Sequence, residues 1–290
     1  MITRNAYAKI NLGLDVTGRR DDGYHLVRMI MQSIDLSDKL SFSERTDSKI
    51  VIETDDPRIP TDEHNLIWKA ADQLRNYCNV PDKGATIHLE KHIPMAAGMA
   101  GGSTDAAATY IALNELWNLS LSIEQLCDLA IKKGADIPYC IKGGTALSEG
   151  IGEILTPLKD MPSCHIVIAK PALDVSTAWA YTTLDSAPIE DHPDIDGIKD
   201  AIEAHDLSGI TARLGNVLEP ITSGKYTVIE EIRQILLANG AMGARMSGSG
   251  PTVFGIFDNK DLSHAENAVK ELQSKGIAPE LFITKPLTTV

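Results

Sequence analysis

Residues 94–105 read Pro94-Met95-Ala96-Ala97-Gly98-Met99-Ala100-Gly101-Gly102-Ser103-Thr104-Asp105 and join a predicted strand to a predicted helix. Before this stretch, Thr86–Glu90 alternates apolar and polar residues with the period of a strand, and Pro94 has no N–H to donate to a neighbouring strand. After it, apolar residues recur at steps of four, three and four and predict one buried helix face: Ala106, Tyr110, Leu113 and Trp117.

The loop between this strand and helix has the features of a phosphate-binding site. Its residues are small apart from the methionines, so the backbone can turn tightly and its N–H groups stay reachable. Ser103 and Thr104 are the predicted N-caps, and the helix dipole places about half a positive charge at this end. A tight connection that simply packs closely is the alternative.

Two common phosphate motifs do not match this loop. A P-loop needs a lysine where this chain has Gly102, and a dinucleotide fingerprint needs a first G-x-G where it has Ala96-Ala97-Gly98. The loop therefore predicts anion binding through backbone groups without assigning the chain to either of those classes.

Length and composition restrict the classes of protein that fit. A chain of 290 residues exceeds what one hydrophobic core usually serves, so two domains of roughly 140 residues are expected. We find no membrane-spanning apolar run and no signal peptide, which predicts a cytoplasmic protein. The net charge of -13 argues against nucleic acid or an anionic membrane as a partner. The four cysteines lack metal-binding spacing and are expected to be free thiols.

Three further stretches carry candidate functional residues. Alternation over Lys9–Val16 predicts a strand that places Lys9 and Asn11 side by side on a polar face, unless that face is simply solvated. Tyr24-His25 ends a turn-rich loop and can stack on a planar ring, although packing at a strand edge is the alternative. Pro138 disfavours helical geometry at Ile137, so Asp136 is expected on a turn, where aspartate is often only a turn former.

The remaining sequence predicts further elements in both halves. Asn65 is expected to cap a helix, and Ser122 to open one with a capping box that Gly134 closes. Helices are expected over 198–205, 208–217, 228–239 and 263–274, and a loop is expected over 185–196. A second glycine-rich loop, 243–252, leads into the strand Val253–Phe257 and is expected to approach a ligand closely through its backbone.

Three segments, in order and spacing, resemble the superfamily of galactokinase, homoserine kinase, mevalonate kinase and phosphomevalonate kinase. They are 6–12, 94–106 and 247–254. Within it, Gly18–His25 and Gly134–Tyr139 are similar to the members that phosphorylate a cytidine diphosphate ester of methylerythritol. The resemblance implies an α+β fold of two domains, 1–158 and 159–290. The first would be ribosomal-protein-S5-domain-2-like and the second ferredoxin-like, with the active site in the cleft between them.

The resemblance also implies the roles of individual residues. Asp136 would be the catalytic carboxylate and Lys9 its cationic partner. ATP would be held by Asn65 near the adenine and by the loop residues Pro94, Met95, Ala96, Ala97, Gly98, Met99, Ala100, Gly101, Gly102, Ser103 and Thr104. The cytidyl substrate would be held by Asn11, Tyr24, His25, Thr177 and Tyr181. Alanines 96, 97 and 100 stand where the family often has glycine, which leaves their N–H groups reachable if φ stays negative.

The implied activity is transfer of the ATP γ-phosphoryl group to the 2-hydroxyl of the methylerythritol moiety, in the non-mevalonate isoprenoid pathway. Mg²⁺ is the implied metal, with the Ser103 hydroxyl as a candidate ligand. The enzyme is expected to act on this small molecule as a monomer or weak homodimer. The alternatives are another kinase of the superfamily, acting on homoserine or a mevalonate-type alcohol, and a non-catalytic nucleotide-binding regulator with the same fold.

Overall fold

The computed structural model describes residues 1–186 and 188–288, and residue 187, within the predicted loop 185–196, lies outside the described residues. The chain forms two compact units, each built from several segments. Unit 1 comprises residues 1–8, 36–95 and 100–142, and unit 2 comprises 9–35, 96–99 and 143–290. The predicted domain boundary at residue 158 stays a prediction.

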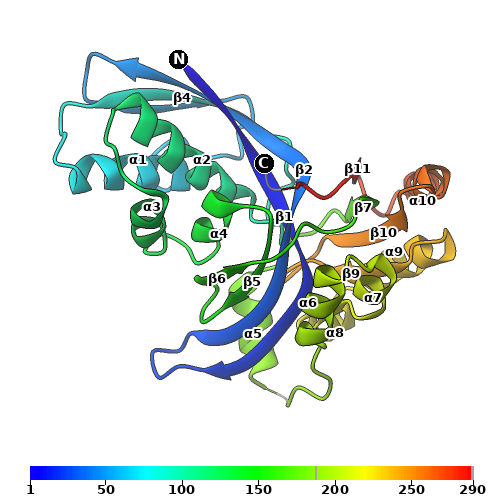
Figure 1. The fold of residues 1–290 in the computed structure, drawn as a ribbon. Coiled ribbons are helices and arrows are strands. Elements are labelled where there is room, and N and C mark those ends of the chain that lie inside the picture. The colour runs from blue at the N-terminus through cyan, green and yellow to red at the C-terminus, as the bar shows by residue number, and fades with distance from the viewer. Residues whose placement is uncertain (187, 289–290) are drawn as a thin grey trace. The chain divides into compact units, whose positions relative to one another are not determined.

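Unit 1 combines a sheet with four helices (Figure 1). Its strands follow the order β3-β4-β2-β1, in which β3 runs parallel and β2 antiparallel to β4. The strands are β1 (Ile2–Arg19, of which 2–8 lie here), β2 (His25–Arg45, of which 36–45 lie here), β3 (Ile50–Thr54) and β4 (Gly84–Glu90). The helices are α1 (Leu66–Tyr77), α2 (Gly101–Leu116), α3 (Ile123–Ala130) and α4 (Ile137–Lys142).

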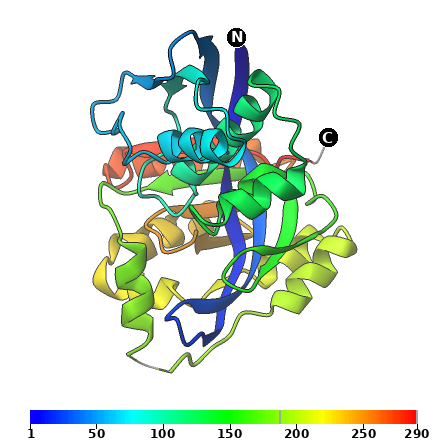
Figure 2. The same ribbon diagram turned by 90° about the vertical axis from the view of Figure 1, so that its left-hand side faces the viewer.

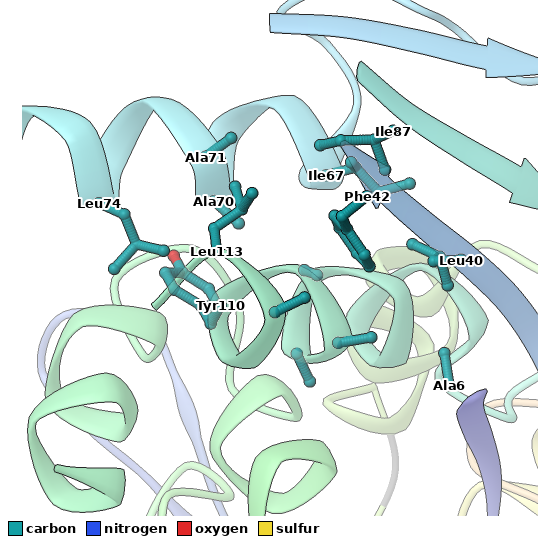
Figure 3. Packing of buried hydrophobic residues seen from close by; sticks show 14 of the residues in the cluster. Ala6, Leu40, Phe42, Ile67, Ala70, Ala71, Leu74, Ile87, Tyr110 and Leu113 are labelled. Carbon is teal, nitrogen blue, oxygen red and sulfur yellow. The ribbon is translucent and has the colours of Figure 1, made fainter. Parts of the chain in front are cut away.

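Helix α2 lies at the centre of the unit 1 core (Figure 3). It is buried on nearly every side, which suits a helix rich in alanine because small side chains let α1 and α4 approach closely. The four residues of the predicted face are buried, which confirms that face: Ala106, Tyr110, Leu113 and Trp117. Asn65 caps α1 as predicted, and Ser122 and Gln125 form the predicted capping box of α3.

The start of α2 differs from the prediction. The helix begins at Gly101, and its N-cap is Ala100, which has a φ of 59° and makes no side-chain capping bond. Ser103 and Thr104 therefore lie inside the first turn, and their prediction as N-caps is wrong. Ala96 also has a positive φ, of 49°, so the condition of negative φ stated for the loop alanines is not met at these two positions.

Unit 2 contains a ferredoxin-like sheet with the strand order β11-β7-β10-β9, in which neighbouring strands are antiparallel. Strands β7 (Cys164–Lys170) and β10 (Val253–Asp258) are central and almost wholly buried, which explains their continuous apolar sequences. The outer strands are β9 (Gly243–Met246) and β11 (Glu280–Thr284). Helices α9 (Val228–Ala238) and α10 (Leu262–Lys275) pack against these strands, and Figure 2 shows them in yellow and red.

The rest of unit 2 is formed by the hairpin of β1 and β2 and the elements that accompany it. Strand β8 (Gly215–Asn216) runs parallel to β1, and β5 (Thr145–Glu149) pairs with both β2 and β6 (Ile154–Pro157). Four more helices complete the unit: α5 (Thr177–Leu184), α6 (Ile195–Glu203), α7 (Leu207–Ala212) and α8 (Glu219–Lys225).

Several predicted boundaries are wrong for local reasons. The predicted helix 208–217 is the shorter α7, because the chain then pairs with β1 as β8. Ile137 is helical despite preceding Pro138, since proline is tolerated in a first helical turn. The segment 243–246 is strand rather than loop, and α3 ends at Ala130, before Gly134. Within the described residues, no helix combines the length and apolarity needed to cross a bilayer.

The strained start of α2 generates a stability prediction. Alanine in the left-handed region costs on the order of 1 kcal/mol, whereas glycine there costs only the extra entropy of the unfolded chain. We expect Ala100→Gly to leave the free energy of unfolding within about 0.5 kcal/mol or raise it. Ala108→Gly, in the middle of the same helix, should lower it by about 1 kcal/mol or more. Urea unfolding measures both; equal destabilisation by the two changes would contradict the argument.

Candidate active site

The N-terminus of α2 has no capping side chain and so has the free N–H groups that an anion could bind. Thr104 N–H makes the first bond back to Ala100 at 2.9 Å, so the amides of residues 101–103 have no acceptor within the helix. Gly101 packs tightly, because a Cβ there would lie 3.1 Å from Lys91 Nζ. The Thr104 hydroxyl is buried and donates to the Tyr7 carbonyl at 2.7 Å. The first turn therefore offers backbone N–H groups and the Ser103 hydroxyl.

A buried charge cluster lies beside this helix end. Lys91 Nζ donates to Asp38 Oδ2 at 2.5 Å and to Asp105 Oδ2 at 2.7 Å. Asp38 Oδ1 accepts the backbone N–H groups of His92 and Ile93, which tethers the chain just before the loop. Burial raises the pKa of Asp105 from 3.8 to about 8 despite the attraction of Lys91. Its Oδ1 has no hydrogen-bond partner among the described residues.

In unit 2, the three segments of the superfamily resemblance meet at the carbonyl of Gly98. That oxygen accepts from Lys9 Nζ at 3.1 Å and from the Ser247 hydroxyl at 3.0 Å. Lys9 Nζ also donates to Asn11 Oδ1 at 2.7 Å. Lys9 and Asn11 are thus neighbours, as predicted, but both are buried and do not lie on a solvated face.

The second glycine-rich loop is held by side chains from three elements. The buried amide of Asn216 donates to the carbonyls of Met246 and Gly248, both at 2.8 Å. The hydroxyls of Thr177, on α5, and Ser249 are 3.0 Å apart, and the Thr222 hydroxyl donates to the Ser249 carbonyl. These bonds fix the loop close to Gly98, where a Cβ would lie 2.1 Å from the Ser247 carbonyl oxygen.

Two aromatic residues predicted to bind substrate, Tyr24 and His25, lie at the hairpin of β1 and β2, and the third, Tyr181, lies on α5. The rings of His25 and Tyr181 have centroids 4.9 Å apart, and Tyr24 is 60% exposed. His25 Nε2 lies 2.7 Å from Asp185 Oδ1, and Arg19 Nη1 lies 3.1 Å from Asp185 Oδ2. An exposed aromatic beside a fixed aromatic pair suits recognition of a planar base.

Asn65 and Asp136 belong to unit 1. The Asn65 side chain accepts from Ile67 N–H and donates to the Pro60 carbonyl, so both ends of its amide are engaged. Asp136 lies on a turn, as predicted, at the entrance to α4. Its half-buried carboxylate makes no hydrogen bond or ion pair with any described residue. The convergence of Asp136 with Lys9, which belongs to unit 2, stays a prediction.

Sequence reasoning missed several residues that support the site. Lys91 lies three residues before the stretch 94–105 and Asp105 is its last residue, and Ser247 lies in the second glycine-rich loop, but the sequence assigned no role to any of them. Asp185 follows Tyr181 by four residues, the spacing of one helix face. Asn216 and Asp38 carry no sequence signal, because their partners are far away in the chain.

Two protein-family models match the chain. The N-terminal domain of the GHMP kinases matches residues 65–144, and their C-terminal domain matches residues 192–278. The class defined by the fold and the site is therefore that of the GHMP kinases, which are ATP-dependent kinases of small molecules. The predicted two-domain α+β fold of this class is confirmed.

Full-length relatives narrow the class. The 4-diphosphocytidyl-2-C-methyl-D-erythritol kinase of Clostridium perfringens is 46% identical over 98% of both chains. That of Lachnoclostridium phytofermentans is 48% identical over 98% of this chain and 97% of its own. A crystal structure of a 4-(cytidine 5'-diphospho)-2C-methyl-D-erythritol kinase is 29% identical, with a TM-score of 0.82 over 99% of this chain and all of that chain. The chain belongs to the family of these kinases.

A second solved structure supports the fold alone. Homoserine kinase from Cytophaga hutchinsonii has a TM-score of 0.79 over 99% of this chain and 94% of its own, at 18% identity. A fold of this kind is thus also found in a kinase named for a different acceptor, so the fold alone does not identify the acceptor.

The shifted pKa of Asp105 predicts a pH effect on stability. Because the folded protein holds this proton more tightly than the unfolded chain, the contribution of Asp105 to stability is lost as the pH rises from about 4 to about 8. The free energy of unfolding of Asp105→Asn, relative to that of wild type, should be at least ~1 kcal/mol higher at pH 9 than at pH 5. Urea unfolding at both pH values measures the gain.

A matched control separates this effect from general charge removal. The ion-pair hydrogen bond from Arg45 lowers the pKa of exposed Asp47 to about 2, so Asp47 does not titrate between pH 5 and pH 9. Asp47→Asn should therefore change the free energy of unfolding by the same amount at pH 5 and at pH 9. If the free energies of unfolding of wild type and Asp105→Asn change with pH in parallel, the assignment of this pH effect to Asp105 is wrong.

Proposed function

We propose that this protein transfers the γ-phosphoryl group of ATP to the 2-hydroxyl of 4-diphosphocytidyl-2-C-methyl-D-erythritol. The observation that carries the proposal is the 46–48% identity, over nearly the whole chain, with kinases named for this substrate. The proposal places this step in non-mevalonate isoprenoid synthesis. We further propose that the protein is cytoplasmic and acts as a monomer or weak homodimer. We also propose that it has no nucleic-acid partner, since the net charge of -13 disfavours binding to nucleic acid.

The loop 94–104 and the N-terminus of α2 bind the ATP phosphates in this proposal. The amides of Gly101, Gly102 and Ser103 support this role because they have no acceptor within the helix and face no capping side chain. The protein's net negative charge makes such a local positive end necessary for a polyanionic ligand. Asn65 would lie near the adenine, held rigidly by its cap.

Lys9 and Asp136 act on the acceptor alcohol. The Asp136 carboxylate accepts or orients the hydroxyl proton, a role supported by its lack of a partner among the described residues. The Lys9 ammonium, buried and directed by Asn11 and the Gly98 carbonyl, stabilises the developing alkoxide. Phosphoryl transfer depends mainly on such positioning and charge stabilisation, so no covalent intermediate is required.

Asn11, Tyr24, His25, Thr177 and Tyr181 bind the cytidyl substrate in this proposal. The stacked His25 and Tyr181 rings beside exposed Tyr24 support recognition of the base. Homoserine and mevalonate carry no base, which favours the cytidyl substrate over these alternatives. A regulator without catalysis would require neither Lys9 nor Asp136, and both are present.

At the N-terminus of α2, a divalent cation would be held largely by the phosphates of the bound nucleotide. Mg²⁺ supplies charge neutralisation between the β- and γ-phosphates when it is bound. The Ser103 hydroxyl is our candidate ligand, while the nearest carboxylate in sequence, Asp105, is buried against Lys91. We therefore propose that phosphate oxygens and Ser103 hold the metal together.

A substrate panel tests the proposed function. ADP release is measured with ATP and Mg²⁺ in the presence of the cytidine diphosphate ester of methylerythritol, of homoserine or of mevalonate. We expect release only with the cytidyl ester, and loss of that release on adding a chelator. ADP release with only mevalonate or only homoserine would contradict the proposed substrate, although the protein would still be a small-molecule kinase.

Removal of the proposed catalytic carboxylate gives a second test. Asp136→Asn keeps the size of the side chain but abolishes its basicity, so kcat should fall at least ~10²-fold while the KM for ATP changes little. Asp128→Asn, in the neighbouring helix α3, is the control and should retain full turnover. An active Asp136→Asn enzyme would remove this residue from its proposed role.

A further inference from the structure

Helix α5 presents an aromatic ring and a carboxylate to the same histidine. Tyr181 lies in its last turn and Asp185 is its C-cap, four residues later, so both side chains are on one face. His25, the first residue of β2, packs against Tyr181 with ring centroids 4.9 Å apart and an interplanar angle of 35°, and its Nε2 lies 2.7 Å from Asp185 Oδ1. A ring held by both an aromatic contact and a hydrogen bond has little freedom to turn.

The second oxygen of Asp185 is also engaged. Arg19 Nη1, at the end of β1, lies 3.1 Å from Asp185 Oδ2. The carboxylate thus connects both strands of the hairpin to α5, across the turn that carries Tyr24. Hydrogen bonding from His25, together with the charge of Arg19, lowers the pKa of Asp185, which is therefore ionised at neutral pH.

This bond determines which ring nitrogen of His25 carries the proton. An ionised carboxylate only accepts hydrogen bonds, so His25 Nε2 must be the donor. In the neutral ring, Nδ1 is then an acceptor, and it has no hydrogen-bond partner among the described residues. An acceptor in a fixed aromatic site favours a base edge that carries an amino group, as cytosine does, over one that carries a carbonyl, as uracil does.

We propose that Asp185 is a positioning residue that orients the His25 ring in its Nε2–H form and so sets the preference for an amino-bearing pyrimidine. This inference rests on the proposed function, because it assigns the base of that substrate to His25. Asp185 itself does not touch the reacting atoms. Its loss therefore affects binding of the cytidyl substrate and not the chemical step.

The structure predicts how variants at this position behave. Asp185→Ala should raise the KM for the cytidyl substrate about tenfold or more, with kcat and the KM for ATP nearly unchanged. It should also reduce the preference for the cytidyl ester over its uridyl analogue. Asp185→Asn should restore most of the preference, because its amide oxygen still accepts from Nε2. Glu190→Ala removes an exposed acid five residues further along the chain and should change none of these values.

A measurement without substrate tests the same inference independently. ¹⁵N NMR of the histidine rings should show His25 as the Nε2–H tautomer in the wild-type protein and as a mixture in Asp185→Ala. If wild type phosphorylates the cytidyl ester but Asp185→Ala keeps its KM, base preference and tautomer, this inference fails alone. If wild type does not phosphorylate that ester, the proposed function fails, and the NMR result still decides whether Asp185 sets the tautomer.

Discussion

The carbonyl of Gly98 is the point on which the arrangement of unit 2 depends. It accepts hydrogen bonds from Lys9 and Ser247, which come from opposite ends of the chain. Only glycine can occupy position 98, because its φ is 69° and a Cβ would collide with the Ser247 carbonyl. One small residue thus lets three separate segments approach within hydrogen-bonding distance, and it directs the buried ammonium that the proposed chemistry requires.

In unit 1, different constraints act on the residues that precede the loop 94–104 and on those that lead from it into α2. The chain enters α2 through an alanine in the left-handed region, and Lys91 with its two aspartates fixes the backbone just before the loop. Buried charges of this kind are costly unless fully paired, so their presence beside the uncapped end of α2 favours a positioning role over a purely stabilising one. The orphan Asp105 Oδ1 and the raised pKa of that carboxyl have the same origin, which is burial with too few donors.

In the proposed function, substrate recognition and phosphate binding fall to different elements. The N-terminus of α2 would hold the phosphates, whereas the hairpin of β1 and β2 and helix α5 would supply the aromatic and charged side chains that recognise the base. Asp185 connects these elements through Arg19 and His25.

The sequence by itself determined the local features of the protein. Periodicity predicted the buried face of α2, capping residues predicted the starts of α1 and α3, and three ordered motifs predicted the class of kinase. Only the tertiary structure decided where α2 begins, that Lys9 and Asn11 are buried, and which residues support the site. Asp38, Asn216 and Asp185 find their partners 53, 30 and 160 residues away, respectively. Local patterns report helix and strand periods, whereas contacts over such separations exist only once the chain has folded.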